Sequence, residues 1–438
     1  ISQYVDLKKR GKNYFGLSPF RSETKPSFSV APDKNMWYDF GSGQGGNAVQ
    51  FLIEYEKISF AEAIRSLAEK HNIDIIEVGD EQQSNLYDQL YEIHNLANLF
   101  YINNLSSKKG LKAKAYMADR FFDDIIIQKF SLGYAHDSWD QLYNELKDKF
   151  DNEVIEKSGL FSKSKKGFLD RFRNRIMFPI RNSTGNIIGF GGRIFNQQDG
   201  AKYLNSPETK LFHKSYELYG LYESKKSISQ EDKVLIVEGY TDVIGLHNSG
   251  IKNCVATLGT AFTKFHFKKI IRYTINITFC FDGDVAGKSA AWKAINNCLP
   301  ELKDGVQLSL IFLPEGSDPD TFVKEEKDEF LNLINNAMPL SQFIIQSLKS
   351  NLDINSVEGR TAFLINAKKI IDEMPDITYT TILKKEFENI GGNIIRKNIA
   401  PKVESVNAEI SIQKDHFDIK ELTLINILLE YPNLLEDR

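Results

Sequence analysis

Cysteine is scarce in this chain, and its scarcity argues against two kinds of cross-link. Three of the 438 residues are cysteine, and Cys254, Cys280 and Cys298 form no C-x-x-C pair. This spacing does not support a disulfide framework or a cysteine-based metal site. We expect a reducing, cytoplasmic environment in which the three thiols are small buried residues.

The chain also lacks a net positive charge and a long hydrophobic run. Its 55 Lys and Arg residues and 59 Asp and Glu residues give a formal net charge of −4, so any basic surface must be local. No apolar run approaches the ~18 residues of a membrane span, and no signal-peptide pattern is present. With 42% hydrophobic and 26% charged residues, the composition is typical of a soluble globular protein of about three domains.

Patterns of apolar residues divide the chain into stretches of different character. Three prolines and short alternating segments such as 27–30 indicate a small β-rich module in the first 80 residues. The turn 182–186 lies between two apolar runs and predicts a β-hairpin, and basic residues concentrate in the same region. Four short apolar runs then alternate with helical patterns, at 234–237, 254–257, 275–281 and 308–313. This alternation predicts a mainly parallel sheet and an α/β (α+β multidomain) fold.

Acidic residues follow three of these apolar runs. Glu238 follows the first run, Asp282 and Asp284 follow the third, and Asp318 and Asp320 come shortly after the fourth. Because the carboxyl ends of parallel strands open onto one edge of a sheet, we expect these side chains to converge. Clustered carboxylates repel one another unless cations neutralise them, and Mg²⁺ prefers carboxylates combined with water and substrate phosphates. The cluster therefore indicates phosphoryl or nucleotidyl transfer.

A helix cap is the structural alternative for these acids. Either Asp282 or Asp284 alone would more often cap the helix that follows it. The combination of Glu238 with both aspartates favours metal binding instead. Asp242, four residues beyond Glu238, is as compatible with an exposed helical acid as with a place on the same edge.

Two of these acidic segments resemble the motifs of a known superfamily. Residues 237–243, Val-Glu-Gly-Tyr-Thr-Asp-Val, and residues 281–287, Phe-Asp-Gly-Asp-Val-Ala-Gly, look like the two acidic motifs of the Toprim fold. That fold is shared by bacterial primases, topoisomerases and some nucleases. Residues 171–180, 189–193 and 202–209 narrow the resemblance to the bacterial DnaG-type DNA primase, and the similarity runs over nearly the whole chain.

The resemblance implies an enzyme that makes short RNA primers on single-stranded DNA from ribonucleoside triphosphates. Glu238, Asp282 and Asp284 would be its essential acids, and Asp318 and Asp320 would complete a site for Mg²⁺ or Mn²⁺. Metals there would activate the 3′-hydroxyl and help pyrophosphate leave, in two-metal nucleotidyl transfer for chromosomal replication. The residues that match the family's template and nucleotide contacts are Arg171, Arg173, Arg175, Arg193, Lys202, Tyr203, Asn205 and Lys214.

The spacing of the basic residues is informative without the family. Arg171, Arg173 and Arg175 alternate, so on one strand all three would face the same side and contact phosphates in a row. A solvated strand face is the structural alternative. Gly191 and Gly192 permit close approach of a nucleic acid, although paired glycines more often mark a bulge or bend.

The first 80 residues depart from the family pattern. Primases of this type usually begin with a zinc ribbon whose ligands are three Cys and one His, and the matching positions here are Ser18, Arg21, Asp39 and Ser42. With no thiolate at these positions, we predict that zinc is absent. We expect the surrounding aromatic residues to form a core and an Arg21–Asp39 ion pair to replace the metal cross-link. The module would still select template through aromatic and polar contacts, unless its aromatics are only core.

The resemblance also implies a domain organisation and partners. The expected parts are a zinc-ribbon-like DNA-binding module at 1–80, the basic N-terminal subdomain of a primase core at 85–228 and a Toprim domain at 229–315. A helical subdomain at 316–398 and the start of a helicase-interaction domain at 418–438 follow. Because the chain begins without Met and stops in a leucine-rich helical pattern, we expect both ends to be clipped and the region that binds the replicative helicase to be truncated. We expect a bacterial cytoplasmic monomer at the nucleoid and replisome, with no membrane contact.

Two other functions compete with RNA synthesis. A Toprim nuclease or topoisomerase would use the same acids, but the basic region before the Toprim motifs favours the primase. A nucleic-acid-binding relative with decayed catalysis would explain the lost zinc ligands. All the expected acids of the metal cluster are present, however, and they favour an active enzyme.

Overall fold

The structure is a computed structural model of the 438-residue chain. It describes residues 1–2, 4–21, 23–56, 63–64, 66–68, 81–165, 167–195, 201–350 and 352–392. The segment 418–438, expected to begin a further domain, lies outside the described residues. Among the described helices, none combines the length and the apolar character that crossing a membrane requires.

The first strands form a five-stranded antiparallel sheet in the order β1-β2-β3-β4-β5. Strand β3 confirms the strand predicted at 27–30. The rings of Phe28 and Trp37 stack with centroids 5.5 Å apart, and with Phe51 they form the core of this module. The expected aromatic core is confirmed for Phe28 and Trp37, whereas Tyr38 and Phe40 are exposed. The elements are β1 (Lys8–Arg10), β2 (Asn13–Gly16), β3 (Phe28–Ala31), the 3-10 turn η1 (Pro32–Lys34), β4 (Met36–Asp39), β5 (Gln44–Gly46) and α1 (Ala48–Glu56).

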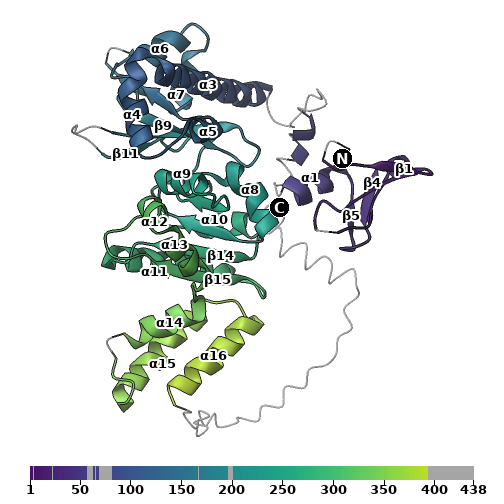
Figure 1. The fold of residues 1–438 in the computed structure, drawn as a ribbon, viewed down its shortest axis with the longest axis vertical. Coiled ribbons are helices and arrows are strands. Elements are labelled where there is room, and N and C mark those ends of the chain that lie inside the picture. The colour runs from purple at the N-terminus through teal and green to yellow at the C-terminus, as the bar shows by residue number, and fades with distance from the viewer. Residues whose placement is uncertain are drawn as a thin grey trace, which may run out of the picture. The chain divides into compact units, whose positions relative to one another are not determined.

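A four-stranded antiparallel sheet with its helices forms the next part (Figure 1). Strands β9 and β10 pair as the predicted hairpin, with a register shift between Ile187 and Gly189. The sheet order is β11-β10-β9-β6, and β7 and β8 form a separate hairpin. The elements are α3 (Glu81–Ser106), η2 (Lys108–Gly110), α4 (Leu111–Asp119), α5 (Asp124–Lys129), β6 (Gly133–Ala135), α6 (Gln141–Leu146), α7 (Asn152–Lys157), β7 (Phe161–Ser164), β8 (Gly167–Asp170), β9 (Arg175–Arg181), β10 (Ile187–Arg193) and β11 (Tyr203–Asn205).

The third sheet is parallel over four strands, as predicted. Its order is β13-β12-β14-β15-β16, and only the short strand β16 is antiparallel to its neighbour. Helices cover both faces, which explains why its strands are continuous apolar runs. The elements are α8 (Leu221–Glu231), β12 (Val234–Val237), α9 (Tyr240–Asn248), β13 (Cys254–Ala256), α10 (Lys264–Ile270), β14 (Asn276–Phe281), α11 (Val285–Cys298), η3 (Leu299–Glu301), β15 (Gln307–Phe312), α12 (Pro319–Glu325), α13 (Lys327–Asn335) and β16 (Met338–Pro339).

The four-stranded sheet and the parallel sheet share one hydrophobic core. Ile176 and Phe178 of β9 belong to the same buried cluster as Leu235 and Val237 of β12. The alternate residue Ile236 faces a second cluster, because successive side chains of a strand point to opposite faces. The shared core holds the antiparallel sheet beside the carboxyl edge of the parallel sheet.

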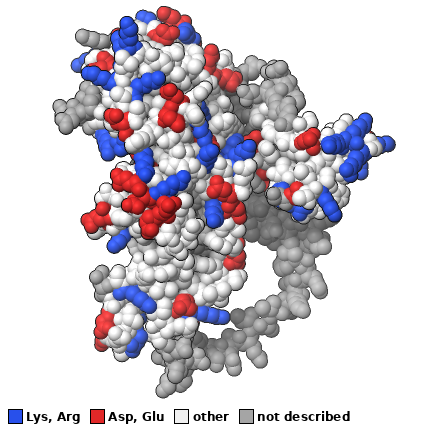
Figure 2. Space-filling model, viewed as in Figure 1, with Lys and Arg blue, Asp and Glu red and all other residues white. Residues whose placement is uncertain are grey.

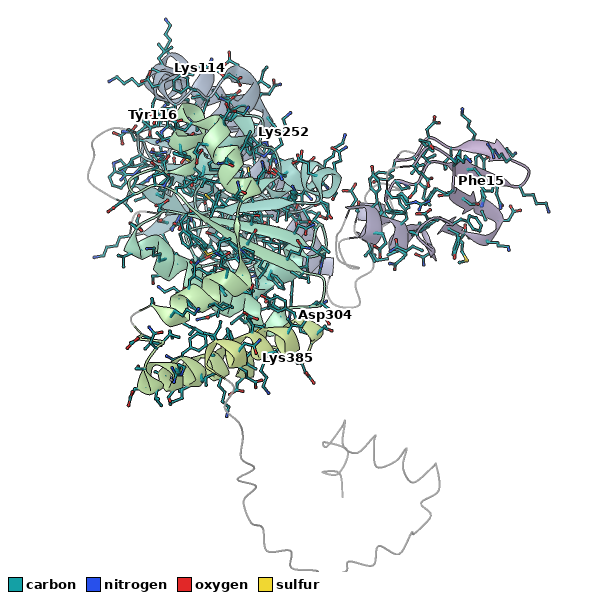
Figure 3. All side chains as sticks on the ribbon, turned by 60° about the horizontal axis from the view of Figure 1, so that its bottom comes forward. Phe15, Lys114, Tyr116, Lys252, Asp304 and Lys385 are labelled. Carbon is teal, nitrogen blue, oxygen red and sulfur yellow. The ribbon has the colours of Figure 1, made fainter. Side chains whose placement is uncertain are left out.

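Helices follow the parallel sheet up to residue 390, as predicted for 320–396, of which 393–396 lie outside the described residues. Phe343 of α14 packs in the second cluster with Phe363 and Phe387, whose rings meet edge to face at 5.9 Å. Asp304, before β15, accepts hydrogen bonds of 3.0 Å from the backbone N–H groups of Thr378 and Tyr379, at the start of α16 (Figure 3). The carboxylate satisfies free N–H groups of the helix terminus. The helices are α14 (Leu340–Lys349), α15 (Val357–Asp372) and α16 (Thr378–Ile390).

Candidate active site

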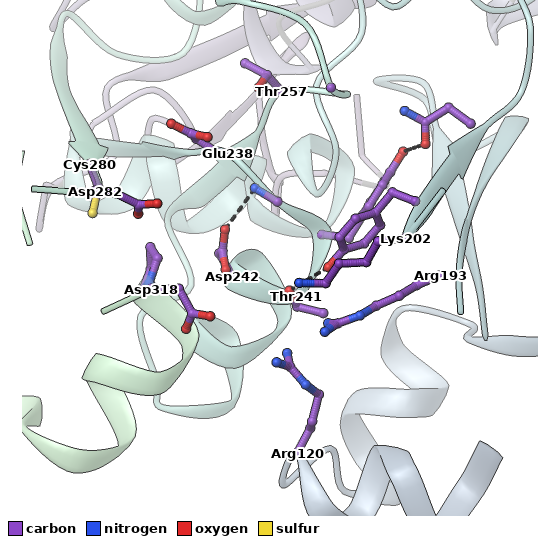
Figure 4. Close-up of a pocket in the computed structure, with 16 residues that line it drawn as sticks. Arg120, Arg193, Lys202, Glu238, Thr241, Asp242, Thr257, Cys280, Asp282 and Asp318 are labelled. Carbon is purple, nitrogen blue, oxygen red and sulfur yellow. Dashed lines mark hydrogen bonds between the residues drawn. The ribbon is translucent and has the colours of Figure 1, made fainter. Parts of the chain in front are cut away.

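A cavity of about 390 Å³ lies at the carboxyl edge of the parallel sheet. Glu238 follows β12, Asp282 follows β14 and Asp318 precedes α12, so the expected convergence of acids from separate strands is observed for these three residues. Figure 4 shows the acids on one side of the cavity and basic side chains on the other. The other charged lining residues are Arg120, Arg193, Lys202 and Asp242.

The acids of the cavity hold their charge at an electrostatic cost. Desolvation raises the pKa of Glu238, and the nearby Asp282 and Asp284 raise it further. Desolvation likewise raises the pKa of Asp282, with added repulsion from Asp284 and Asp318. Burial and the charge of Asp318 raise the pKa of Asp242 to about 8. A cation in the cavity would remove this cost, because it would stabilise the ionised carboxylates.

Helix capping accounts for part of the acidic cluster. Asp284 Oδ1 accepts a 2.7 Å hydrogen bond from the backbone of Gly287 and caps α11, and Asp318 Oδ1 accepts one of 2.8 Å from Thr321 and caps α12. The capping alternative therefore holds for Asp284 and not for Asp282. A cap uses one carboxylate oxygen, and the other oxygen stays available to a ligand.

The donor set of this edge fits a hard divalent cation. Glu238, Asp282 and Asp318 all present carboxylate oxygens, the ligand type that Mg²⁺ prefers. Among the described residues, no three Asp, Glu, His or Cys side chains form a ready-made metal cage. Mg²⁺ takes one or two carboxylates and completes its shell with water and substrate phosphates.

Two acids have environments that the sequence did not settle. Asp242 is 8% exposed and accepts a 2.9 Å hydrogen bond from the Gly239 backbone, so it lies on the same edge as Glu238 and is not an exposed helical acid. Asp320 is buried and does not line the cavity. It lies between Arg120 and Lys324 instead.

The opposite wall contains a guanidinium with free donors. Arg193, at the end of β10, is 5% exposed and lies between the rings of Tyr116 and Tyr203, 5.6 and 5.3 Å from their centroids. Its Nε and Nη1 atoms have no hydrogen-bond partner among the described residues. A buried guanidinium with free N–H groups is costly unless a ligand satisfies them. The position therefore suits an anion such as phosphate.

The expected row of three arginines on one strand is wrong. Strand β8 ends before Arg171, and Asn174 takes a left-handed conformation with φ 48° before β9 begins at Arg175. Arg171 donates to the Asn205 carbonyl oxygen, and Arg175 is buried with Nη1 3.1 Å from the Gly192 carbonyl oxygen. The guanidinium carbon of Arg173 lies 3.2 Å from the ring centroid of Trp139.

The polar residues of β11 connect the basic subdomain to the parallel sheet. Asn205 donates to the Leu258 carbonyl oxygen at 2.8 Å and accepts a 2.6 Å hydrogen bond from the Tyr240 hydroxyl. The Tyr203 hydroxyl lies 3.3 Å from that of Thr241. Tyr203, Asn205 and Lys202 line the cavity, whereas Lys214 does not.

Sequence reasoning missed Arg120. It caps the C-terminus of α4 and reaches the cavity from a segment more than a hundred residues before the acidic motifs. A single arginine beside Phe121 and Phe122 has no local pattern that signals a binding role, because only the tertiary fold brings it to the site.

Three of the four positions expected to replace the zinc ligands, Ser18, Asp39 and Ser42, are joined by hydrogen bonds centred on Asp39. Asp39 is fully buried and accepts hydrogen bonds from the hydroxyls of Ser18 and Ser42, both at 2.8 Å, and from the Gly41 N–H at 3.0 Å. The expected Arg21–Asp39 ion pair is wrong, because Arg21 pairs with Glu23 at 2.6 Å. Two hydroxyls, a guanidinium and one carboxylate do not fit structural zinc, which requires thiolate or imidazole ligands.

The fold and the site define a class of protein. A parallel sheet with carboxylates on its C-terminal edge, joined to a basic antiparallel subdomain, is a Toprim enzyme that acts on nucleic acid. Family models match in the same order along the chain: a CHC2 zinc finger at 1–83, the N-terminal domain of the DNA primase catalytic core at 100–225, a Toprim domain at 232–312 and a DnaB-helicase binding domain of primase at 341–386.

Individual relatives agree with the family models. The chain is 37% identical to the DNA primase of Escherichia coli K12 over 444 residues, which covers 99% of this chain and 76% of that protein. A DnaG catalytic domain solved with single-stranded DNA matches with a TM-score of 0.66 and 38% identity, over 70% of this chain and 99% of that one. The zinc-binding and RNA polymerase domains of Aquifex aeolicus primase match with a TM-score of 0.61 and 34% identity, over 89% of this chain and 92% of that one. The chain belongs to the bacterial DnaG-type primase family, and its activity is that of a DNA primase, an RNA-synthesising enzyme.

Proposed function

We propose that the cavity carries out two-metal nucleotidyl transfer on a single-stranded DNA template. One observation carries this proposal: carboxylates with raised pKa values face, across one cavity, the free N–H donors of Arg193. A nucleoside triphosphate with its divalent cations supplies both missing partners, since the cations pair with the acids and the phosphates with the guanidinium.

The positions of Glu238, Asp282 and Asp318 on the cavity support the roles proposed for the acids. Glu238, Asp282 and Asp284 would hold Mg²⁺ or Mn²⁺, with Asp318 as a further ligand. When bound, the cations lower the pKa of the attacking 3′-hydroxyl and stabilise the charge that develops on the leaving pyrophosphate. Asp242 accepts the Gly239 N–H and so fixes the turn that presents Glu238.

Arg193 and Lys202 orient the phosphates of the incoming ribonucleotide. They lie on the wall opposite the acids, and an arginine forms paired hydrogen bonds with phosphate oxygens. We assign template and primer contacts to the remaining predicted residues of this region. They are Arg171, Arg173, Arg175, Tyr203, Asn205 and Lys214.

The N-terminal module contributes a second nucleic-acid surface. Strand β1 consists of exposed basic residues, and Figure 2 shows Lys and Arg gathered at that end of the module. Tyr38 and Phe40 are exposed with ring centroids 4.9 Å apart, an arrangement on which bases can stack. We propose that this module selects template, and that it does so without zinc.

The parts and partners follow the family organisation. We propose the boundaries 1–80, 85–228, 229–315 and 316–398 for the successive domains, with the start of a further domain at 418–438. The replicative helicase is the proposed partner of the C-terminal region, since a helicase-binding family model matches at 341–386. We propose a monomer that acts on the chromosome in the bacterial cytoplasm.

Primer synthesis with a matched variant tests the proposal. The purified chain is incubated with single-stranded DNA, labelled ribonucleotides and Mg²⁺, beside Asp282→Asn, which keeps the shape of the side chain. Short RNA made by the wild type and lost in the variant is the expected result. Cleavage of the DNA without RNA synthesis would instead favour a Toprim nuclease, and an inactive wild type that still binds DNA would favour a binding protein.

A further inference from the structure

A buried ion-pair cluster joins α12 to the loop between α4 and α5. Asp320 is 1% exposed, with Oδ2 2.9 Å from Arg120 Nη1 and Oδ1 2.7 Å from Lys324 Nζ. Lys324 Nζ also donates a 2.9 Å hydrogen bond to the Arg120 carbonyl oxygen. Asn248 of α9 donates to the Phe121 carbonyl oxygen at 2.7 Å. Residues of α12 and α9 therefore hold both the side chain and the backbone around Arg120.

The surroundings of Asp320 differ from those of a metal ligand. Each of its oxygens already faces a cation, so a divalent ion would have to displace Arg120 or Lys324. A Cβ atom at Gly245 would lie 2.0 Å from Asp320 Oδ1, which shows how closely α9 covers this carboxylate. Asp318, two residues earlier, is exposed and lines the cavity.

Arg120 connects this cluster to the cavity. Its side chain is 22% exposed and lines the cavity with Arg193 and Lys202. Figure 4 shows it pointing toward the space between Asp318 and Arg193. Cations that share a wall repel one another, and a buried carboxylate beside one of them offsets the repulsion. With Nη1 held by Asp320, the remaining N–H groups of Arg120 keep a fixed direction.

We propose that Asp320 is a positioning residue that acts through Arg120 and does not coordinate the divalent cations. It fixes the guanidinium at the cavity wall, where Arg120 contacts a phosphate of the nucleotide substrate. Lys324 supports the same arrangement by holding the Arg120 backbone. This inference rests on the proposed function, because it requires a nucleoside triphosphate in the cavity.

Two measurements on the full chain separate positioning from metal binding. Asp320→Asn keeps the shape of the side chain and removes its charge, and Asp282→Asn serves as the control for loss of a metal ligand. The first measurement is the affinity for Mn²⁺ alone, from the free ion counted by electron paramagnetic resonance. The second is the KM for ribonucleotides in primer synthesis.

We expect Asp320→Asn to bind Mn²⁺ within about twofold of the wild type and to raise KM by about tenfold, the effect of losing one charge-assisted hydrogen bond. In the Arg120→Ala background the same substitution should raise KM no further, because the two residues act as one unit. Mn²⁺ binding weakened as much as in Asp282→Asn would overturn the proposal. So would an unchanged KM, or effects of Arg120→Ala and Asp320→Asn that multiply.

Lys324→Met keeps the test decisive if Asp320→Asn fails to fold. This variant retains the Asp320–Arg120 pair but frees the Arg120 carbonyl oxygen. We expect it to raise KM by about threefold with unchanged Mn²⁺ affinity, and an unchanged KM would contradict the proposal. The proposed function fails separately, if the wild type makes no RNA or if Asp282→Asn keeps both synthesis and Mn²⁺ affinity.

Discussion

Two acidic regions of this chain have opposite electrostatic arrangements. In the N-terminal module, burial alone would raise the pKa of Asp39, but hydrogen bonds from Ser18, Ser42 and Gly41 lower it below its ordinary value. At the Toprim edge, Glu238 and Asp282 have raised pKa values because desolvation and neighbouring acids oppose their charge. A buried carboxylate with enough donors is stable by itself, and one that faces other carboxylates requires a cation. The comparison teaches that the hydrogen-bond donors around a carboxylate, and not its burial, decide whether it requires a metal ion.

The largest expected effect tests the Toprim side of the comparison. Asp282→Asn should reduce primer synthesis by about 10³-fold, because a bound cation supplies several kcal/mol of charge stabilisation in the transition state. The thermal midpoint measured without divalent cation should stay the same or rise, since one of several repelling charges is removed. Primer synthesis and thermal unfolding of the same preparation check both expectations. A variant that loses activity and stability together would show that the edge is a structural cluster.

The next effect concerns the N-terminal module. Asp39→Ala should destabilise this module by about 3 kcal/mol, because it leaves the buried Ser18 hydroxyl, the Ser42 hydroxyl and the Gly41 N–H group without their acceptor. Hydrogen exchange of the amides in β3 and β4, measured on the full chain, should rise by about 10²-fold. Ser42→Ala removes one donor only and should cost about 1 kcal/mol. Equal effects of the two substitutions would contradict a network centred on Asp39.

The sequence predicted most of the fold because its strong signals are local. The apolar run that became β12 and the turn between β9 and β10 each depend on neighbouring residues, so periodicity was sufficient to find them. The predicted row of Arg171, Arg173 and Arg175 on one strand is wrong because it too depends on neighbouring residues alone. The alternation of the arginines predicts one strand, and no local signal indicates that Asn174 takes a left-handed conformation.

The candidate site was predictable where residues follow strands and not where they arrive from elsewhere. Glu238 and Asp282 were expected at the edge because strand ends of a parallel sheet must meet there. Arg120 has no such local signal, and Asp320 is expected among the metal ligands from its place after an apolar strand and from the family resemblance. The pairing of these two residues depends on contact between segments 200 residues apart, which spacing along the chain does not encode.

Acid should destabilise the N-terminal module only at low pH. The folded pKa of Asp39 lies below its ordinary value, and a hydrogen bond from Ser27 is the largest cause that lowers the pKa of Glu23 to about 2. Groups of this kind add stability that is complete above about pH 5 and is lost as pH falls through their folded pKa. We therefore expect exchange of the β3 and β4 amides, corrected for intrinsic rates, to be constant from pH 8 to about pH 5 and to increase below about pH 4. An increase that began near neutral pH would contradict the hydrogen-bond network.

The smallest expected effect is an unchanged amide exchange in the N-terminal module when metal is removed. This result would separate the two regions most clearly. A chelator such as EDTA should abolish primer synthesis and leave exchange of the β3 and β4 amides unchanged, because no group around Asp39 is a zinc ligand of the usual kind. As a positive control, Ser18, Arg21, Asp39 and Ser42 can be replaced together by Cys, His, Cys and Cys, after which the module should depend on zinc and respond to the chelator. If EDTA raised exchange in the unaltered module, a metal would have to be held there. The hydrogen bonds around Asp39 would then not be what replaces the metal cross-link of the zinc ribbon. An unchanged module with lost synthesis would instead mean that this chain confines its use of metal to the edge where phosphates react.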